Sequence, residues 1–233
     1  MTYESLDTAA SLLARSLHGV RPGDAVCVLA DRSINWLVAA FGILKARGVY
    51  VPLDPAVPSG VRDENFRRCG AQTYIAPTRS SLVTRPSEAR VFLVVEDVLL
   101  ASPSTQTFPH RLKPIPDDPA YICFTSGSTG MPKAVLCTHK SLVAFQKTLE
   151  IRLFASHGAR IAQTMSPVFD GSILEIFSAL CYGATICLAE ENAASPFDHV
   201  KLCSSAIFTP SLAKVLDPHD FPELKYVRKV KFQ

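Results

Sequence analysis

Hydroxyl side chains, glycines and one lysine are concentrated in residues 125–133, where the sequence is TSGSTGMPK. Glycines let backbone N–H groups approach an anion closely, hydroxyls donate to phosphate oxygens, and the Lys133 ammonium adds positive charge. The hydroxyl and glycine residues are Thr125, Ser126, Gly127, Ser128, Thr129 and Gly130. The segment matches neither of two common glycine-rich nucleotide motifs, G-x-x-x-x-G-K-[ST] and G-x-G-x-x-G. It predicts a phosphate-binding loop of another kind, and the alternative is a plain Ser/Gly surface loop.

A second candidate is the carboxylate of Asp170, in the segment FDGS at residues 169–172. A carboxylate can pair with a cation in a partly dry pocket, where its removal leaves an unpaired charge. It can equally cap a helix that begins near Ser172. The residues alone leave both roles open.

Both candidates lie in a chain that alternates short apolar segments with amphipathic ones. Continuous apolar segments are typical of buried strands, and helical spacing of apolar residues is typical of helices. The expected strands are residues 25–30, 50–53, 73–75, 91–95, 121–124, 135–136, 184–188 and 206–208, with another near residue 161. The expected helices cover about residues 6–17, 34–48, 140–149 and 172–180, with a short one after residue 210. The alternation predicts an α/β fold of layered, mainly parallel sheets with flanking helices.

Charge and cysteine patterns argue against two classes of protein. The net charge of +3 comes from three basic residues among the last six, Arg228, Lys229 and Lys231, so the rest of the chain is neutral and has no basic stripe for nucleic acid. The seven cysteines include no C-x-x-C pair. A disulfide framework or a zinc site is therefore not expected, and the cysteines are expected to be buried, reduced thiols. No metal site is predicted.

Nothing in the sequence indicates a membrane protein. The longest nearly apolar run, residues 36–44, is much shorter than the roughly twenty residues of a membrane span. The first residues, MTYES, lack the basic and apolar regions of a secretory signal. The expected location is cytoplasmic, with neither a membrane nor a nucleic acid as partner.

Several segments, in the right order, resemble the adenylation domains of nonribosomal peptide synthetases, which belong to the adenylate-forming, AMP-dependent ligase superfamily. Residues 125–133 resemble its phosphate-binding loop, and residues 44–54, LKARGVYVPLD, resemble L-K-A-G-x-A-Y-V-P-I-D. The further matches are residues 2–6 (TYESL) with L-T-Y-x-E-L, FDGS with F-D-x-S, and residues 209–212 (TPSL) with the T-P-S end of a strand. The resemblance reaches about Tyr226 and implies the large N-terminal lobe of this fold.

The resemblance implies amino-acid adenylation: an amino acid and Mg-ATP give aminoacyl-AMP and pyrophosphate, and the adenylate is then loaded on a phosphopantetheinyl carrier domain. It implies ATP and Mg²⁺ as cofactors. Residues 125–130 would hold the ATP phosphates, Lys133 would neutralise them as the catalytic residue, and Asp170 would pair with the substrate α-ammonium. Gly171, Leu174 and Ile207 would line an apolar or aromatic side-chain pocket, although Leu174 and Ile207 can also be ordinary core residues.

Two departures from the family pattern stand out. Ala134 replaces the glycine that usually follows Pro-Lys, which is tolerable where φ is negative. The later motifs, which serve adenine, ribose and Mg²⁺, and the small C-terminal lobe are not in the sequence. We therefore expect an incomplete AMP-binding domain at residues 1–226, with a proline-rich loop at residues 102–119, and a divergent basic tail at residues 227–233. Such a chain is expected to have little or no ligase activity.

Two alternatives to an amino-acid ligase remain. The chain can be a non-catalytic pseudo-enzyme fragment, or a piece of an acyl-CoA or aryl-acid ligase. Acids without an α-amino group do not need a carboxylate partner, so Asp170 argues against the second alternative.

Overall fold

The computed structural model describes residues 1–81, 85–101, 114–125, 133–189, 197–217, 219–227 and 229–232. The chain divides into two compact units, unit 1 at Met1–Leu142 and unit 2 at Val143–Gln233. Among the described residues, no helix is both long and apolar enough to cross a membrane.

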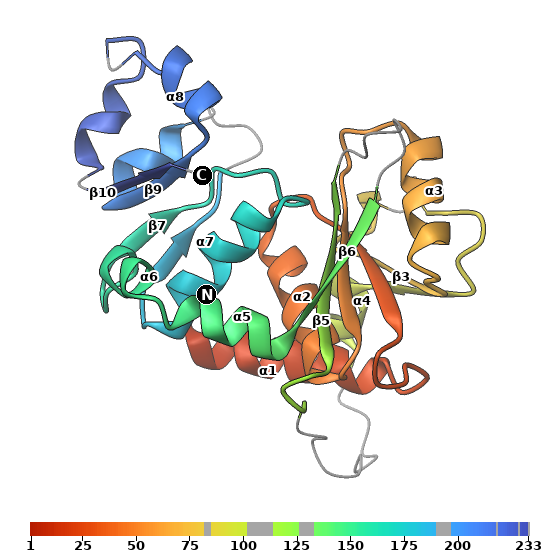
Figure 1. The fold of residues 1–233 in the computed structure, drawn as a ribbon. Coiled ribbons are helices and arrows are strands. Elements are labelled where there is room, and N and C mark those ends of the chain that lie inside the picture. The colour runs from red at the N-terminus through yellow and green to blue at the C-terminus, as the bar shows by residue number, and fades with distance from the viewer. Residues whose placement is uncertain are drawn as a thin grey trace. The chain divides into compact units, whose positions relative to one another are not determined.

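Unit 1 is built on a six-stranded sheet (Figure 1). In sheet order the strands are β4 (Val91–Val94), β3 (Thr73–Ala76), β1 (Ala25–Leu29), β2 (Val49–Leu53), β5 (Pro119–Thr125) and β6 (Lys133–Thr138). Neighbouring strands are parallel, except that β5 and β6 pair as an antiparallel hairpin. The central strands are continuous apolar segments because both faces of the sheet are covered.

One face of this sheet is covered by the helices α1 (Tyr3–Ser16), α2 (Ile34–Lys45) and α4 (Val95–Leu100), which pack against one another. The Thr2 and Ser33 side chains cap α1 and α2 by accepting backbone N–H bonds. A Cβ on Gly42 of α2 would lie 2.8 Å from Leu13 Cδ2, so glycine permits the close contact of the two helices. Between these helices and the sheet, Trp36 Nε1 of α2 donates to the Tyr50 hydroxyl of β2 at 2.7 Å.

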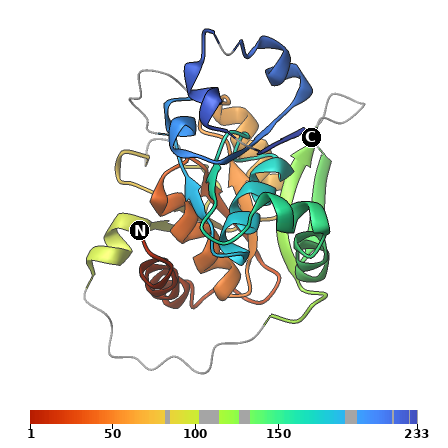
Figure 2. The same ribbon diagram turned by 90° about the vertical axis from the view of Figure 1, so that its left-hand side faces the viewer.

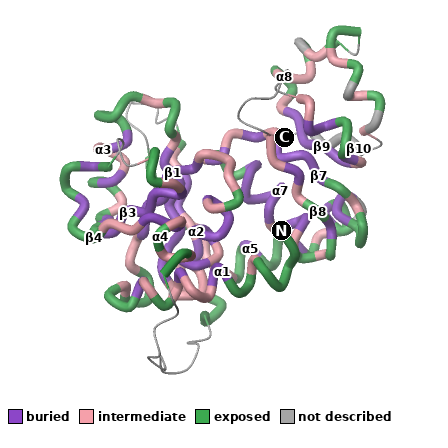
Figure 3. The backbone as a smooth tube through the Cα atoms, turned by 180° about the vertical axis from the view of Figure 1, so that it is seen from behind, coloured by how far each residue is buried: buried purple, intermediate pink, exposed green. Residues whose placement is uncertain are grey.

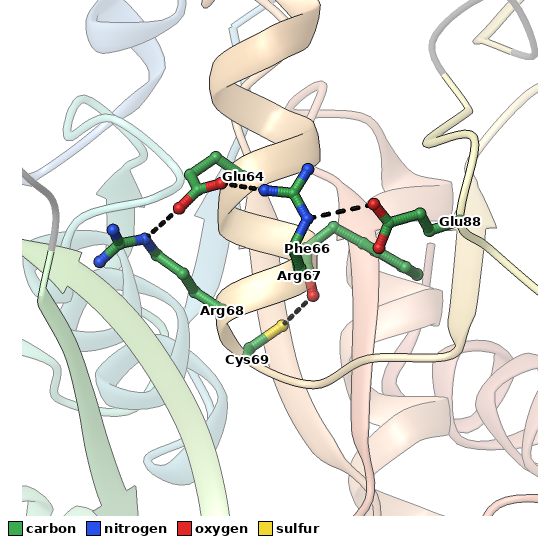
Figure 4. A network of polar contacts seen from close by, with 6 residues as sticks. All are labelled: Glu64, Phe66, Arg67, Arg68, Cys69 and Glu88. Atoms are coloured by element: carbon green, nitrogen blue, oxygen red, sulfur yellow. Dashed lines mark hydrogen bonds and ion pairs between the residues drawn. The ribbon is translucent and has the colours of Figure 1, made fainter.

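The other face is covered by α3 (Ser59–Arg68), which the sequence analysis did not predict (Figure 1). Phe66 enters the core against strands β1 and β2, while the exposed side of the helix carries ion pairs (Figure 4). Arg67 pairs with Glu64 and with Glu88, and Arg68 pairs with Glu64. A helix with so few apolar residues has no clear hydrophobic periodicity, which explains why it was missed.

Unit 2 is built on a four-stranded parallel sheet. In sheet order the strands are β10 (Lys229–Phe232), β9 (Ser205–Phe208), β7 (Arg160–Ala162) and β8 (Thr185–Cys187). The helices of this part of the chain are α5 (His139–Gln146), which begins in unit 1, α6 (Leu149–Phe154), α7 (Asp170–Cys181) and α8 (Pro210–Val215), with 3₁₀ helices η2 (Asp198–Leu202) and η3 (Pro222–Tyr226). Residues 229–232 of the expected tail thus form a strand beside β9.

The core of unit 2 consists of two apolar clusters. One contains Ile151 and Phe154 of α6, Leu174 of α7 and Ile207 of β9. The other contains Phe208 of β9 and Val200 of η2, with Phe197 packing edge-on against Phe208. Helix α7 is buried along most of its length, in contrast to α3 (Figure 3).

The expected α/β fold with mainly parallel sheets is confirmed. Several element boundaries differ from the expected ones. Residue 95, the end of the expected strand at 91–95, instead begins helix α4, for which no element was expected. The expected helix at residues 140–149 is divided into α5 and α6, and α7 begins at Asp170. Most of the expected proline-rich loop, residues 102–113, lies outside the described residues.

Candidate functional site

The β5–β6 hairpin carries the two ends of the candidate phosphate loop (Figure 2). Thr125, the last residue of β5, pairs in register with Lys133, the first residue of β6, and both are exposed. Ser126, Gly127, Ser128, Thr129 and Gly130 lie outside the described residues. The structure therefore brings together one hydroxyl and the lysine of the predicted set at one end of the unit 1 sheet.

An ion pair holds the opposite end of this hairpin. Arg47, after α2, contacts the Asp118 carboxylate with Nη2 at 2.7 Å and Nε at 3.0 Å, and both side chains are largely buried. Burial alone would raise the pKa of Asp118, but hydrogen bonds from Arg47 and from the Ile115 N–H outweigh it and lower the pKa. The Asp118 carbonyl accepts from the His139 N–H at 3.0 Å, so this contact ties the start of β5 to the start of α5.

Asp170 is the first residue of helix α7 and is exposed. Phe169 occupies the N-cap position, so Asp170 does not cap a helix that starts near Ser172. The Ser172 hydroxyl lies within hydrogen-bond distance of two carbonyl oxygens before the helix, that of Pro167 at 2.8 Å and that of Phe169 at 2.9 Å, and can donate to either. A carboxylate in the first turn is favoured by the positive end of the helix dipole.

The three predicted pocket residues are all buried in unit 2. Gly171 follows Asp170 in the first turn of α7, and Leu174 lies in the next turn. Leu174 is 2% exposed, Ile207 is not exposed, and both belong to the same apolar cluster. The structure thus brings together two residues that are 33 positions apart, in a place where they also serve as core.

Glu175, beside Leu174 on α7, is a fully buried carboxylate that the sequence analysis did not single out. It accepts hydrogen bonds from the Thr164 N–H at 2.9 Å, the Met165 N–H at 3.1 Å and Gln163 Nε2 at 3.2 Å. These donors belong to the segment that directly follows strand β7. Burial raises the pKa of Glu175 to about 7, although the hydrogen bonds from Thr164, Met165 and Gln163 oppose that shift.

The Thr164 hydroxyl links this carboxylate to strand β9. Its oxygen lies 2.9 Å from Glu175 Oε1 and 2.5 Å from the carbonyl oxygen of Ile207. A hydroxyl has one proton to donate, so the two acceptors compete for it. The only local sequence signal for this network is an acidic residue within the apolar segment ILEIF at residues 173–177.

The described residues contain no group of three His, Cys, Asp or Glu side chains that could hold a metal ion. The part of the chain that the structure describes thus has no cluster of three such ligands for Mg²⁺. The other predicted residues form two sets, Thr125 and Lys133 in unit 1 and Asp170, Gly171, Leu174 and Ile207 in unit 2.

Comparison with known proteins identifies a family. The family of AMP-binding enzymes matches residues 1–228 of the chain. The nonribosomal peptide synthetase aclP of Aspergillus oryzae is 49% identical over 228 residues, which are 97% of this chain and 14% of that protein. The nonribosomal peptide synthetase ataP of Aspergillus terreus is 48% identical over 97% of this chain and 15% of that protein. The chain thus spans only a small part of the length of these relatives.

Solved structures share the fold. The N-terminal subdomain of Klebsiella oxytoca NpsA, in complex with 3-hydroxybenzoyl-AMSN, has a TM-score of 0.85 at 23% identity over 100% of this chain and 59% of that chain. The nonribosomal peptide synthetase FmoA3, bound to alpha-methyl-L-serine-AMP, has a TM-score of 0.78 at 27% identity over 93% of this chain and 25% of that chain. The architecture is that of the N-terminal subdomain of adenylate-forming enzymes.

Proposed function

The chain belongs to the AMP-binding enzyme family, and on this premise we propose that it serves in the adenylation of an amino acid. In this reaction the amino-acid carboxylate attacks the α-phosphate of ATP, giving aminoacyl-AMP and releasing pyrophosphate. The observation that carries the proposal is Asp170, an exposed carboxylate on the first turn of a helix whose following residues are buried and mostly apolar. This arrangement offers a partner for an ammonium group next to an apolar environment for a side chain.

Residues 125–130 and Lys133 are proposed to bind the ATP phosphates. The register of β5 with β6 supports this role, because it places Thr125 opposite Lys133 at one end of the sheet. Donors and cations held in position stabilise the negative charge that is redistributed as pyrophosphate leaves. Lys133 would contact those oxygens and act as the catalytic residue. The family also implies Mg²⁺, which would supply further charge neutralisation when bound.

The substrate is proposed to be an apolar or aromatic amino acid. Gly171 adds no side-chain volume, and Leu174 and Ile207 present only hydrocarbon. An apolar wall favours an apolar side chain because burying it removes hydrocarbon surface from water. The adenylate would then be passed to the thiol of a phosphopantetheinyl carrier domain, as the family resemblance implies.

An acyl-CoA or aryl-acid ligase is the competing function. Its substrates carry no α-ammonium group, so an acidic residue at the position of Asp170 would have no charge to pair with. The position of Asp170 on α7 therefore favours the amino-acid substrate.

We infer that a polypeptide of residues 1–233 alone catalyses the reaction slowly. These residues include the proposed phosphate loop and part of the proposed amino-acid pocket, and they span only a small part of the length of the relatives that they match. Positioning supplies much of the rate in such chemistry, so a partial set of contacts supports little turnover. If the turnover of the chain alone is zero, its role is non-catalytic.

The proposal is tested by amino-acid-dependent ATP–pyrophosphate exchange in two samples. One is the chain alone, and the other is the complemented domain, in which residues 1–228 are joined to the remainder of an adenylation domain of the same family. We expect exchange near background in the first and exchange dependent on an apolar or aromatic amino acid in the second. A folded complemented domain that is silent with every amino acid would contradict the proposed function. Strong exchange by the chain alone would contradict its proposed slow turnover.

A further inference from the structure

The buried contacts of Glu175 connect three elements that carry or adjoin the proposed amino-acid pocket. Its carboxylate lies on α7, next to Leu174 and five residues after Asp170. It accepts the N–H groups of Thr164 and Met165, which follow β7. Through the Thr164 hydroxyl it reaches the carbonyl oxygen of Ile207 on β9. A carboxylate can connect α7, the segment after β7 and β9 at once, because its two oxygens offer several acceptor sites for hydrogen bonds.

We propose that Glu175 is a positioning residue for the amino-acid pocket, with Thr164 as the relay that sets Ile207 of β9 relative to Leu174 of α7. This inference rests on the proposed function, since it concerns the same pocket. It goes further by assigning the geometry of the pocket to a buried pair, Glu175 and Thr164, that does not itself need to touch the substrate.

The relay has two states because the Thr164 hydroxyl has one proton and two acceptors. When Glu175 is ionised, the hydroxyl donates to the carboxylate and the Ile207 carbonyl loses this donor. When Glu175 is protonated, its O–H can donate to Thr164 Oγ1, and the hydroxyl is then free to donate to Ile207. The protonated state therefore satisfies both acceptors and ties β9 to α7 more firmly.

Other titratable or charged side chains lie on the elements packed against this network, namely Glu150 and Arg152 of α6, Arg160 of β7, Cys181 of α7, Cys187 of β8, and Asp198 and Lys201 of η2. His199 of η2 has Nε2 at 3.2 Å from the Gln163 carbonyl oxygen, and the Cys187 carbonyl of β8 accepts from the Gln163 N–H. Asp170 lies on the helix of Glu175 itself. The pKa of Glu175 lies near 7 chiefly because of burial, which places the change between the two states close to neutral pH.

The test measures the amino-acid KM and kcat of the complemented domain between pH 6 and 8, in four variants beside the wild type. Glu175→Leu removes the acceptor, Glu175→Gln mimics the protonated acid, and Thr164→Val removes the relay alone. Ser205→Ala is the matched control, because it removes another buried hydroxyl of β9, which donates to the Phe154 carbonyl at 3.2 Å and takes no part in the hydrogen bonds between Glu175, Thr164 and Ile207.

We expect Glu175→Leu and Thr164→Val to raise the amino-acid KM by roughly tenfold, the size of coupling within one contact network, with little change in kcat. The wild-type KM should rise as the pH passes 7, while Glu175→Gln should keep the low-pH value throughout. Ser205→Ala should behave as the wild type. An unchanged KM in Thr164→Val, or the same pH profile in the wild type and Glu175→Gln, would overturn the inference. Thr164→Val keeps the test valid if Glu175→Leu does not fold.

Amide hydrogen exchange on the full chain gives a readout that does not depend on activity. Glu175→Leu should lose protection at the Thr164 and Met165 amides, while Ser205→Ala should retain it. Retained protection in Glu175→Leu would overturn the inference even if the proposed function holds. A wild-type complemented domain without exchange activity would contradict the proposed function, and the amide result would then decide whether the network holds the β7 end in place.

Discussion

The proposed phosphate-binding region of unit 1 and the proposed amino-acid-binding region of unit 2 are held in different ways. At the β5–β6 hairpin, Thr125 and Lys133 are exposed, and strand pairing sets their positions. At the start of α7, Gly171, Leu174 and Glu175 are buried, and side-chain hydrogen bonds and core packing set theirs. Function and stability are therefore expected to be separable in the first region and coupled in the second. Substitutions at the hairpin should alter chemistry alone, whereas those along α7 should alter folding as well.

The largest effect is expected at the hairpin. Lys133→Ala in the complemented domain should lower ATP–pyrophosphate exchange by roughly 10²–10³-fold, as for removal of one electrostatic contact to developing charge. The free energy of unfolding of the chain should change by less than about 0.5 kcal/mol, because the side chain is exposed. Lys140→Ala is the matched control. Lys140 is also exposed, and its ion pair with Asp117, at 3.8 Å, is a long contact on the surface. Equal losses of ATP–pyrophosphate exchange in Lys133→Ala and Lys140→Ala would contradict a specific role of Lys133 in binding the phosphates.

The next effect concerns the core of unit 2. Leu174→Ala should lower the free energy of unfolding of this unit by about 3 kcal/mol, because it deletes a side chain that is 2% exposed. Denaturant unfolding followed by amide exchange in unit 2 measures the change. Lys133→Ala serves again as the comparison and should leave the free energy of unfolding of unit 2 unaltered. If Leu174→Ala changes amino-acid preference without any loss of stability, Leu174 is a pocket residue and not a core residue.

The pH dependence of stability gives the third effect. The pKa of Glu175 is raised from 4.5 to about 7 in the folded state, so the folded state binds this proton more tightly than the unfolded state. The stabilisation is complete below pH 4.5 and is lost as the pH rises to about 7, with a slope of at most about 1.4 kcal/mol per pH unit. Urea unfolding at a series of pH values should show a smaller slope in Glu175→Gln. Identical slopes would show that Glu175 does not titrate in this range.

The smallest effect compares two helix caps. Thr209, at the start of α8, accepts the Leu212 N–H at 3.1 Å, and Ser33 accepts the Trp36 N–H at 3.0 Å. Replacing either by alanine should lower the free energy of unfolding by about 1 kcal/mol. Thr209→Ala should also raise the amino-acid KM, because it loosens the start of α8 where that helix follows the carboxyl end of β9, while Ser33→Ala should not. A raised KM in both variants would mean that KM follows overall stability.

Local patterns were sufficient for part of the fold. Helices α1 and α2 were predicted from apolar residues at helical spacing. Helix α3 was missed because Phe66 is its only large apolar residue in the core and its other contacts are surface ion pairs. Strand β10 and helix α4 were missed because tertiary pairing determines their conformation more than local sequence does.

The candidate site was predictable to a similar extent. Motifs identified Thr125, Lys133 and Asp170 by residue type and order, and those identifications remain predictions of function. The Glu175 network could not be predicted, because its partners Thr164 and Met165 are ten or eleven positions away and meet it only after β7 packs against α7. The dual position of Leu174 and Ile207, as expected pocket residues in a shared core cluster, also required the fold.

The proposed adenylation depends on recognition of the amino acid through its ammonium group. The most direct test is ATP–pyrophosphate exchange by the complemented domain with an apolar amino acid and with the same acid lacking the α-amino group, in the wild type and in Asp170→Asn. We expect exchange with the amino acid only, and a loss of at least about 30-fold in Asp170→Asn, as for breaking a charge pair worth about 2 kcal/mol. Equal exchange with both acids, unaffected by Asp170→Asn, would contradict recognition through the ammonium group.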